Sequence, residues 1–168
     1  MRKTTPSRSP DVPNTGIAIV GLIFHTWAAV VWVGGMFFAL LALRPAAVVL
    51  EPGPRLDLWL GVLDRFFAWV IVAIVLLLAS GYGMVFGVYG GFRTIPQAVN
   101  IMQGLGIIMM LAFFHVYFAP WRRFKKALAR RDYPAAARQL NQIRWIVVLN
   151  LVLGLATVAI GSSGPYWG

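Results

Sequence analysis

Residues 66–87 read FFAWVIVAIVLLLASGYGMVFG and carry no charge along their whole length. About 20 predominantly apolar residues are enough for a helix to cross the hydrocarbon core of a bilayer. This charge-free run continues to Phe92, and three more such runs occupy residues 12–43, 94–121 and 145–168. Each run is long enough to span a membrane. The sequence therefore predicts an all-α integral membrane protein, an antiparallel four-helix bundle.

The composition of the chain excludes several classes of protein. Only 12% of its 168 residues are charged and 60% are apolar, whereas soluble domains carry about 25% charged residues. An ordinary water-soluble globule is therefore excluded. The chain has no cysteine, which excludes disulfides, thiolate metal ligands and thiol catalysis. It also lacks the common nucleotide-binding and hydrolase motifs.

Charges, prolines and composition shifts set the expected boundaries. We expect a disordered basic tail over residues 1–14 and a single four-span membrane domain over 15–168. The stretch 46–64 mixes leucines with acidic residues and is typical of an interfacial segment. In the connection 121–144, basic clusters alternate with apolar residues, which favours either a surface helix on anionic headgroups, broken at Pro134, or a solvated loop. The spans themselves are expected at about 17–43, 66–87, 98–119 and 145–161.

The net charge of +10 predicts the orientation of the protein in the membrane. Eight of the fifteen basic residues lie in the connection 122–144. Lysine and arginine are enriched on the cytoplasmic side of membrane proteins. We therefore expect a plasma (inner) membrane protein with both termini outside and the connections 44–65 and 120–144 in the cytoplasm. The basic excess then indicates topology and contact with anionic lipid headgroups rather than nucleic-acid binding.

Small and polar residues recur at helical spacing in all four predicted spans. Such stripes are typical of helix–helix contacts rather than lipid-facing surfaces. We expect the following residues to face the bundle interior: His25, Ala29, Trp32 and Met36 in the first span, Ser80, Gly83, Met84 and Gly87 in the second, Asn100, Gly104, Leu111 and His115 in the third, and Asn150, Gly154, Thr157 and Gly161 in the fourth.

Two histidines, His25 and His115, are the ionisable residues well inside the predicted spans, and such groups are candidates for function. At a rise of about 1.5 Å per residue, His25 lies roughly 7 Å outside the membrane midplane and His115 roughly 9 Å inside it. One metal ion cannot bind both. Imidazole and thioether groups suit copper, and Met84 and Met102 lie close to the depth of His25. These residues predict a copper site, while gap-filling methionines remain the simpler alternative.

Haem b is the alternative cofactor, because a four-helix bundle can hold a porphyrin between facing helices. One axial histidine, His25 or His115, would be sufficient. The apolar pocket would be lined by Trp32, Phe37 or Phe113, and the propionates would lie near Arg44, Arg138 or Arg144.

Two strings resemble known families. HTWAAVVWVGGMFF at residues 25–38, followed by Arg44-Pro45, resembles the opening helix of the CopD-like (copper resistance D) membrane domain. It also resembles the first helix of the related HemJ-type protoporphyrinogen oxidases. RQLNQIR at residues 138–144 is similar to the Arg/Asn pair that opens the last HemJ-type helix. The CopD resemblance implies copper uptake or tolerance. The HemJ resemblance implies a haem-associated oxidoreductase, with His25 at the functional histidine and Arg138 and Asn141 binding the cofactor.

Three functions thus remain open. The leading hypothesis is copper handling through His25, helped by Met84 or Met102. The second is a b-type haem redox protein. The third is an accessory subunit that docks onto a larger membrane complex through the basic segment 122–144.

Overall fold

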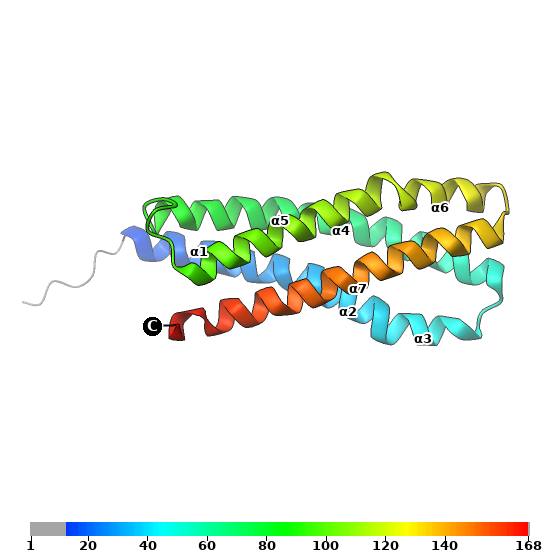
Figure 1. Ribbon diagram of the computed structural model, residues 1–168, viewed down its shortest axis with the longest axis horizontal. Coiled ribbons are helices and arrows are strands. Elements are labelled where there is room, and N and C mark those ends of the chain that lie inside the picture. Colours follow the sequence, from blue (N-terminus) through cyan, green and yellow to red (C-terminus); the bar gives the residue numbers. More distant parts are fainter. Residues whose placement is uncertain (1–12, 168) are drawn as a thin grey trace, which may run out of the picture.

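The computed structural model describes residues 13–167, and every regular element among them is helical. Four helices in this part of the chain are long and apolar enough to cross a membrane: Thr15–Val49, Pro52–Gly87, Gln97–Ala129 and Tyr133–Ser163. They run antiparallel, and the C-terminus lies at the same end as the start of α1 (Figure 1). The predicted all-α membrane bundle is confirmed. Residues 1–12 of the expected basic tail lie outside the described residues, and helix α1 begins at Pro13.

The first spanning helix is built from several pieces. It comprises α1 (Pro13–Ala29), α2 (Gly35–Phe38) and α3 (Arg44–Ala46), and it ends in the 3-10 turn η3 (Ala47–Val49). Two π-helical turns, η1 (Val30–Gly34) and η2 (Ala39–Leu43), separate the α-helical pieces. The sequence pattern predicted an uninterrupted helix here. A π turn inserts one residue without breaking the helix, so hydrophobicity alone does not reveal it.

The other three spans are simpler. The second is α4 (Pro52–Gly87). The third is α5 (Gln97–Phe118), which continues after a bend as α6 (Pro120–Ala129). The fourth is α7 (Tyr133–Ser163), followed by the 3-10 turn η4 (Gly164–Tyr166). Proline, which suits the first turn of a helix, begins α4 and α6. The Asp132 side chain caps α7 by accepting a hydrogen bond from the Ala135 amide at 3.0 Å.

The helices extend further at the basic end of the bundle than the charge-free runs predicted. Most of the expected interfacial segment 46–64 belongs to α4. The prediction that segment 121–144 lies on the headgroups as a surface helix is wrong, because the apolar side of α6 packs into the bundle. Trp121 is 2% exposed and Phe124 is fully buried. The expected break at Pro134 is also misplaced. The turn between α6 and α7 occurs at residues 130–132, where Arg131 adopts a positive φ of 56°.

The predicted interior faces are correct for part of the bundle and wrong for the third span. Trp32 and Met36 in the first span are buried, as are Asn150 and Gly154 in α7. In α5 the expected stripe faces outward, and its Leu111 is 65% exposed. Large side chains occupy the interior face of α5 instead. Close packing of large apolar side chains in the core stabilises the bundle more than burial of the few polar groups of this helix would. All four residues of the expected stripe, Asn100, Gly104, Leu111 and His115, are exposed. The buried residues of α5 are instead Ala98, Met109, Phe113 and Val116.

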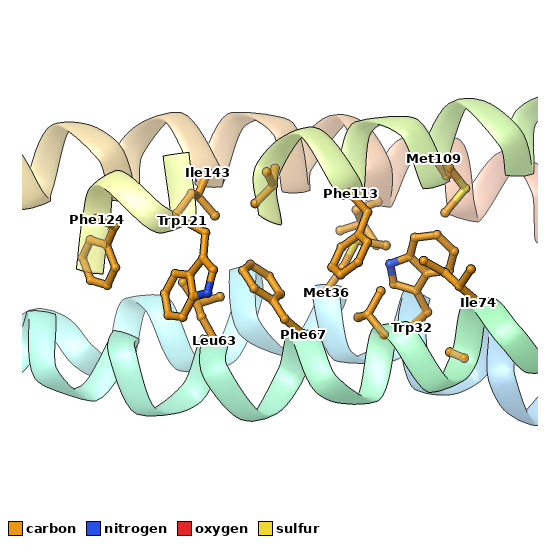
Figure 2. Packing of buried hydrophobic residues seen from close by; sticks show 14 of the residues in the cluster. Trp32, Met36, Leu63, Phe67, Ile74, Met109, Phe113, Trp121, Phe124 and Ile143 are labelled. Carbon is orange, nitrogen blue, oxygen red and sulfur yellow. The ribbon is translucent and has the colours of Figure 1, made fainter. Parts of the chain in front are cut away.

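A series of aromatic side chains fills the bundle core towards its basic end (Figure 2). The ring of Phe67 in α4 packs edge-on against Phe113 at 5.5 Å and against Trp121 at 5.2 Å between centroids. Trp121 in turn stacks on Phe124 at 5.6 Å. These contacts join α4, α5 and α6, so this part of the core is closely packed.

Candidate metal site

Glycines lie in the contact between α1 and α4. A Cβ atom on Gly21 of α1 would lie 2.8 Å from the Cγ atom of Met84 in α4. On α4, a Cβ atom on Gly81 would lie 3.4 Å from the Cε1 atom of His25. Each helix thus supplies one flat glycine surface and one donor side chain that covers the glycine of its neighbour. His25 and Met84 therefore lie about one helical turn apart along the same seam.

A short hydrogen-bond chain holds the His25 ring. Its Nδ1 atom lies 3.0 Å from the Ser80 hydroxyl, and that hydroxyl donates to the Leu76 carbonyl at 2.6 Å. A hydroxyl has a single hydrogen. The contact with Leu76 is the shorter of the two, so we assign the Ser80 hydrogen to Leu76. The Ser80 oxygen then accepts a hydrogen bond from His25 Nδ1. The neutral imidazole then keeps its lone pair on Nε2, which is the state of a metal-binding histidine.

The thioether of Met84 lies beside a shallow groove. This groove of about 480 Å³ runs between α1 and α4, and both Ser80 and Met84 line it. Almost all of its other lining side chains are apolar, among them Val20 and Phe24. The seam thus combines an oriented imidazole with a soft sulfur atom in apolar surroundings.

The structure places the remaining predicted ligands elsewhere. Met102 belongs to the contact between α5 and α7, where a Cβ atom on Gly161 would lie 3.0 Å from its Cε atom. His115 is on the exposed face of α5. Arg138 and Asn141 are exposed in the first turns of α7, at the opposite end of the bundle from the C-terminus (Figure 1). Of the predicted cofactor-binding and metal-binding residues, His25 and Met84 share the seam between α1 and α4.

The pocket expected for haem does not fit a porphyrin. Trp32 and Phe113 pack edge-on against each other, with centroids 6.2 Å apart, and both are buried. Phe37 points away from the interior and is 50% exposed. The two rings that were expected to line the pocket fill its space.

The described part of the chain offers no cluster of the commonest metal-binding side chains. Within residues 13–167 no three His, Cys, Asp or Glu side chains gather into a group that could hold a metal ion. A site built from one imidazole and one thioether needs no such group. These are ligands of the kind that copper accepts, with thioether sulfur favouring the monovalent ion.

The pairing of glycines with donor side chains across the seam was not predicted from the sequence. The signal is present in the sequence, because Gly21 and His25 are four residues apart in α1, and Gly81 and Met84 are three apart in α4. Both spacings place residues on one helical face. An antiparallel alignment of the two stripes that matches glycine to bulky donor would have predicted the contact. Gly87, which packs against Ile17, extends the same alignment by one turn.

Fold and site together define a class of protein: a multi-pass membrane bundle with an imidazole and a thioether in the seam between its first two spans. The family profile described as copper resistance protein D, CopD, matches residues 60–163. The chain belongs to this family, which connects it with copper resistance or handling. The matched range includes Ser80 and Met84 and begins after the span that carries His25. Comparisons with curated proteins and with solved structures find no match.

Proposed function

We propose that this protein handles copper, in uptake or tolerance, through a site in the seam between α1 and α4. His25 Nε2 and the Met84 sulfur are the donors. The observation that carries the proposal is the contact of Ser80 with His25 Nδ1 at 3.0 Å, because it leaves the Nε2 lone pair for a ligand. Family membership independently supports copper as the metal.

The chemistry of the two donors favours monovalent copper in transit. Thioether and imidazole are neutral ligands, so the ion keeps its single positive charge inside an apolar bundle. A charge inside the membrane is costly. Two donors lower that cost, and two donors alone bind the ion weakly enough for it to be released. Under the expected orientation, with both termini outside, this site faces the nearly uncharged outer half of the membrane.

The test is metal analysis of the detergent-purified protein after loading with monovalent copper and removal of excess metal. We expect about one copper ion per chain and no Soret absorption band. A strong Soret band, or a chain that retains no copper, would refute the proposal. Copurification with stable partner proteins and without a metal would favour the accessory-subunit hypothesis instead.

Three variants locate the site. His25→Ala should lose the copper, and Met84→Leu should weaken its retention while keeping a similar volume at the seam. His115→Ala is the matched control, because it removes the other intramembrane histidine from an exposed position. Should His115→Ala lose as much copper as His25→Ala, with both variants folded, the site is not in this seam.

A further inference from the structure

A second cavity lies at the basic end of the bundle, where the end of the first span, the first half of α4 and the start of α7 meet. Its volume is about 290 Å³. Three arginines from these three segments line it, Arg44, Arg55 and Arg144, together with Asn141. The expected propionate positions Arg44 and Arg144 are thus brought together, but around a cavity far along the bundle from His25.

The charge of this cavity is unbalanced. None of the residues that line it is aspartate or glutamate. Three cationic side chains that line one cavity repel one another. An anion in the cavity would relieve this repulsion. Arginine is well suited to that role, since its planar guanidinium binds phosphate through paired hydrogen bonds.

The cavity also has an apolar wall. Leu63 and Phe66 of α4 and Val147 of α7 line it on the side of the charge-free runs. Arg44 directly follows the charge-free run of the first span, and Arg144 directly precedes that of the last. Arg44 and Arg144 therefore lie where the hydrocarbon core of the membrane gives way to the headgroups. A ligand here meets cations at headgroup level and hydrocarbon below.

We propose that this cavity binds an anionic phospholipid of the surrounding membrane. Its phosphate lies between Arg44, Arg55 and Arg144, and the upper part of one acyl chain lies along the wall of Leu63 and Val147. The volume is near the lower end of the roughly 300–1,000 Å³ of ligand pockets. It suits a headgroup and the beginning of a chain, while the rest of the lipid stays in the bilayer. This inference is independent of the copper site.

The experiment is native mass spectrometry of the full chain, released from nanodiscs that contain phosphatidylglycerol and phosphatidylcholine in equal amounts. We expect the wild-type protein to retain phosphatidylglycerol in preference to phosphatidylcholine. The double variant Arg44→Gln/Arg144→Gln should lower that preference roughly tenfold or more, as expected for losing charge-assisted hydrogen bonds. Equal retention of the two lipids by the wild-type protein would overturn the proposal.

Matched variants separate a built site from general charge attraction. Arg123→Gln/Lys126→Gln removes the same charge from the exposed side of α6, outside the cavity, and should keep the preference. Ala137→Phe blocks the cavity without changing charge and should abolish it, which keeps the test valid if the arginine variant misfolds. An equal loss in the α6 variant would overturn the proposal. Displacement of the bound lipid by millimolar inorganic phosphate would also overturn it, because the site would then be one for free phosphate.

Discussion

Ser80→Ala tests the orientation of the His25 imidazole most directly. The substitution removes the oxygen 3.0 Å from Nδ1 and leaves both proposed copper donors in place. The imidazole then loses the partner that fixes its tautomer and its ring plane. Groups that orient a metal-binding histidine contribute about 10- to 100-fold to metal affinity, so we expect copper affinity to fall by this factor. That factor corresponds to about 1.4–2.8 kcal/mol of binding free energy.

The assay is a competition titration of the purified protein with a chromophoric chelator of monovalent copper, which reports affinity rather than occupancy. Ser162→Ala is the matched control. The Ser162 hydroxyl also donates to the carbonyl four residues earlier, that of Val158, at 2.9 Å. Within the described part of the chain it makes no hydrogen bond to another helix. Its copper affinity should equal that of the wild-type protein. Unchanged affinity in Ser80→Ala would refute the assignment of Nδ1 as donor and Nε2 as ligand.

Three further predictions concern the packing of the bundle, each measured as the free energy of unfolding in mixed micelles. The new Cβ atom of Gly154→Ala would lie 2.8 Å from a Val33 methyl group, so this variant should be about 1–3 kcal/mol less stable than the control Gly104→Ala, whose Cβ atom would meet nothing within 4 Å. Equal stabilities of the two variants would contradict the close contact. Asn150→Leu should raise the stability by up to about 1 kcal/mol, because the buried Asn150 Oδ1 atom has no hydrogen-bond partner among the described residues and an interhelical hydrogen bond contributes only about 0.6 kcal/mol. A clear loss of stability would contradict this prediction. Phe124→Ala should cost about 3–5 kcal/mol since the ring is fully buried, and a loss below about 1 kcal/mol would show that α6 is not part of the core.

The number and approximate position of the spans could be predicted because the cost of placing charge in hydrocarbon is large and local. The rotation of each helix could not be predicted equally well. In α7 the polar stripe is a contact face, and the Asn150 amide donates to the Met109 carbonyl at 3.1 Å. In α5 the same reasoning failed, because the core selects the face with the greater packing volume. His115 therefore faces outward, although its burial would have been expected from polarity alone.

The two donors of the proposed copper site were predicted from the sequence, but their common seam was not. His25 and Met84 were identified by their chemistry and their similar depth in the membrane. Their common seam, and the position of Met102 in a different one, depend on which helices are neighbours. Hydropathy carries no information on which helices pack against each other. The pairing of helices depends on close contacts such as that of Gly35 with the ring of Phe66, where a Cβ atom would not fit.

The length of the helices explains why the segment 121–144 resembled a membrane-surface helix. Helix α4 has 36 residues and is about 54 Å long at 1.5 Å per residue, whereas the hydrocarbon core is about 30 Å thick. Its charge-free part alone matches that thickness, so we infer that the first turns of α4 extend beyond the bilayer together with α6 and the start of α7. In this extension apolar residues such as Phe124 and Leu128 face inward and the charges face water. A helix packed in that way has the same amphipathic pattern as a helix lying on lipid, and only the presence of a neighbouring helix on its apolar side distinguishes the two.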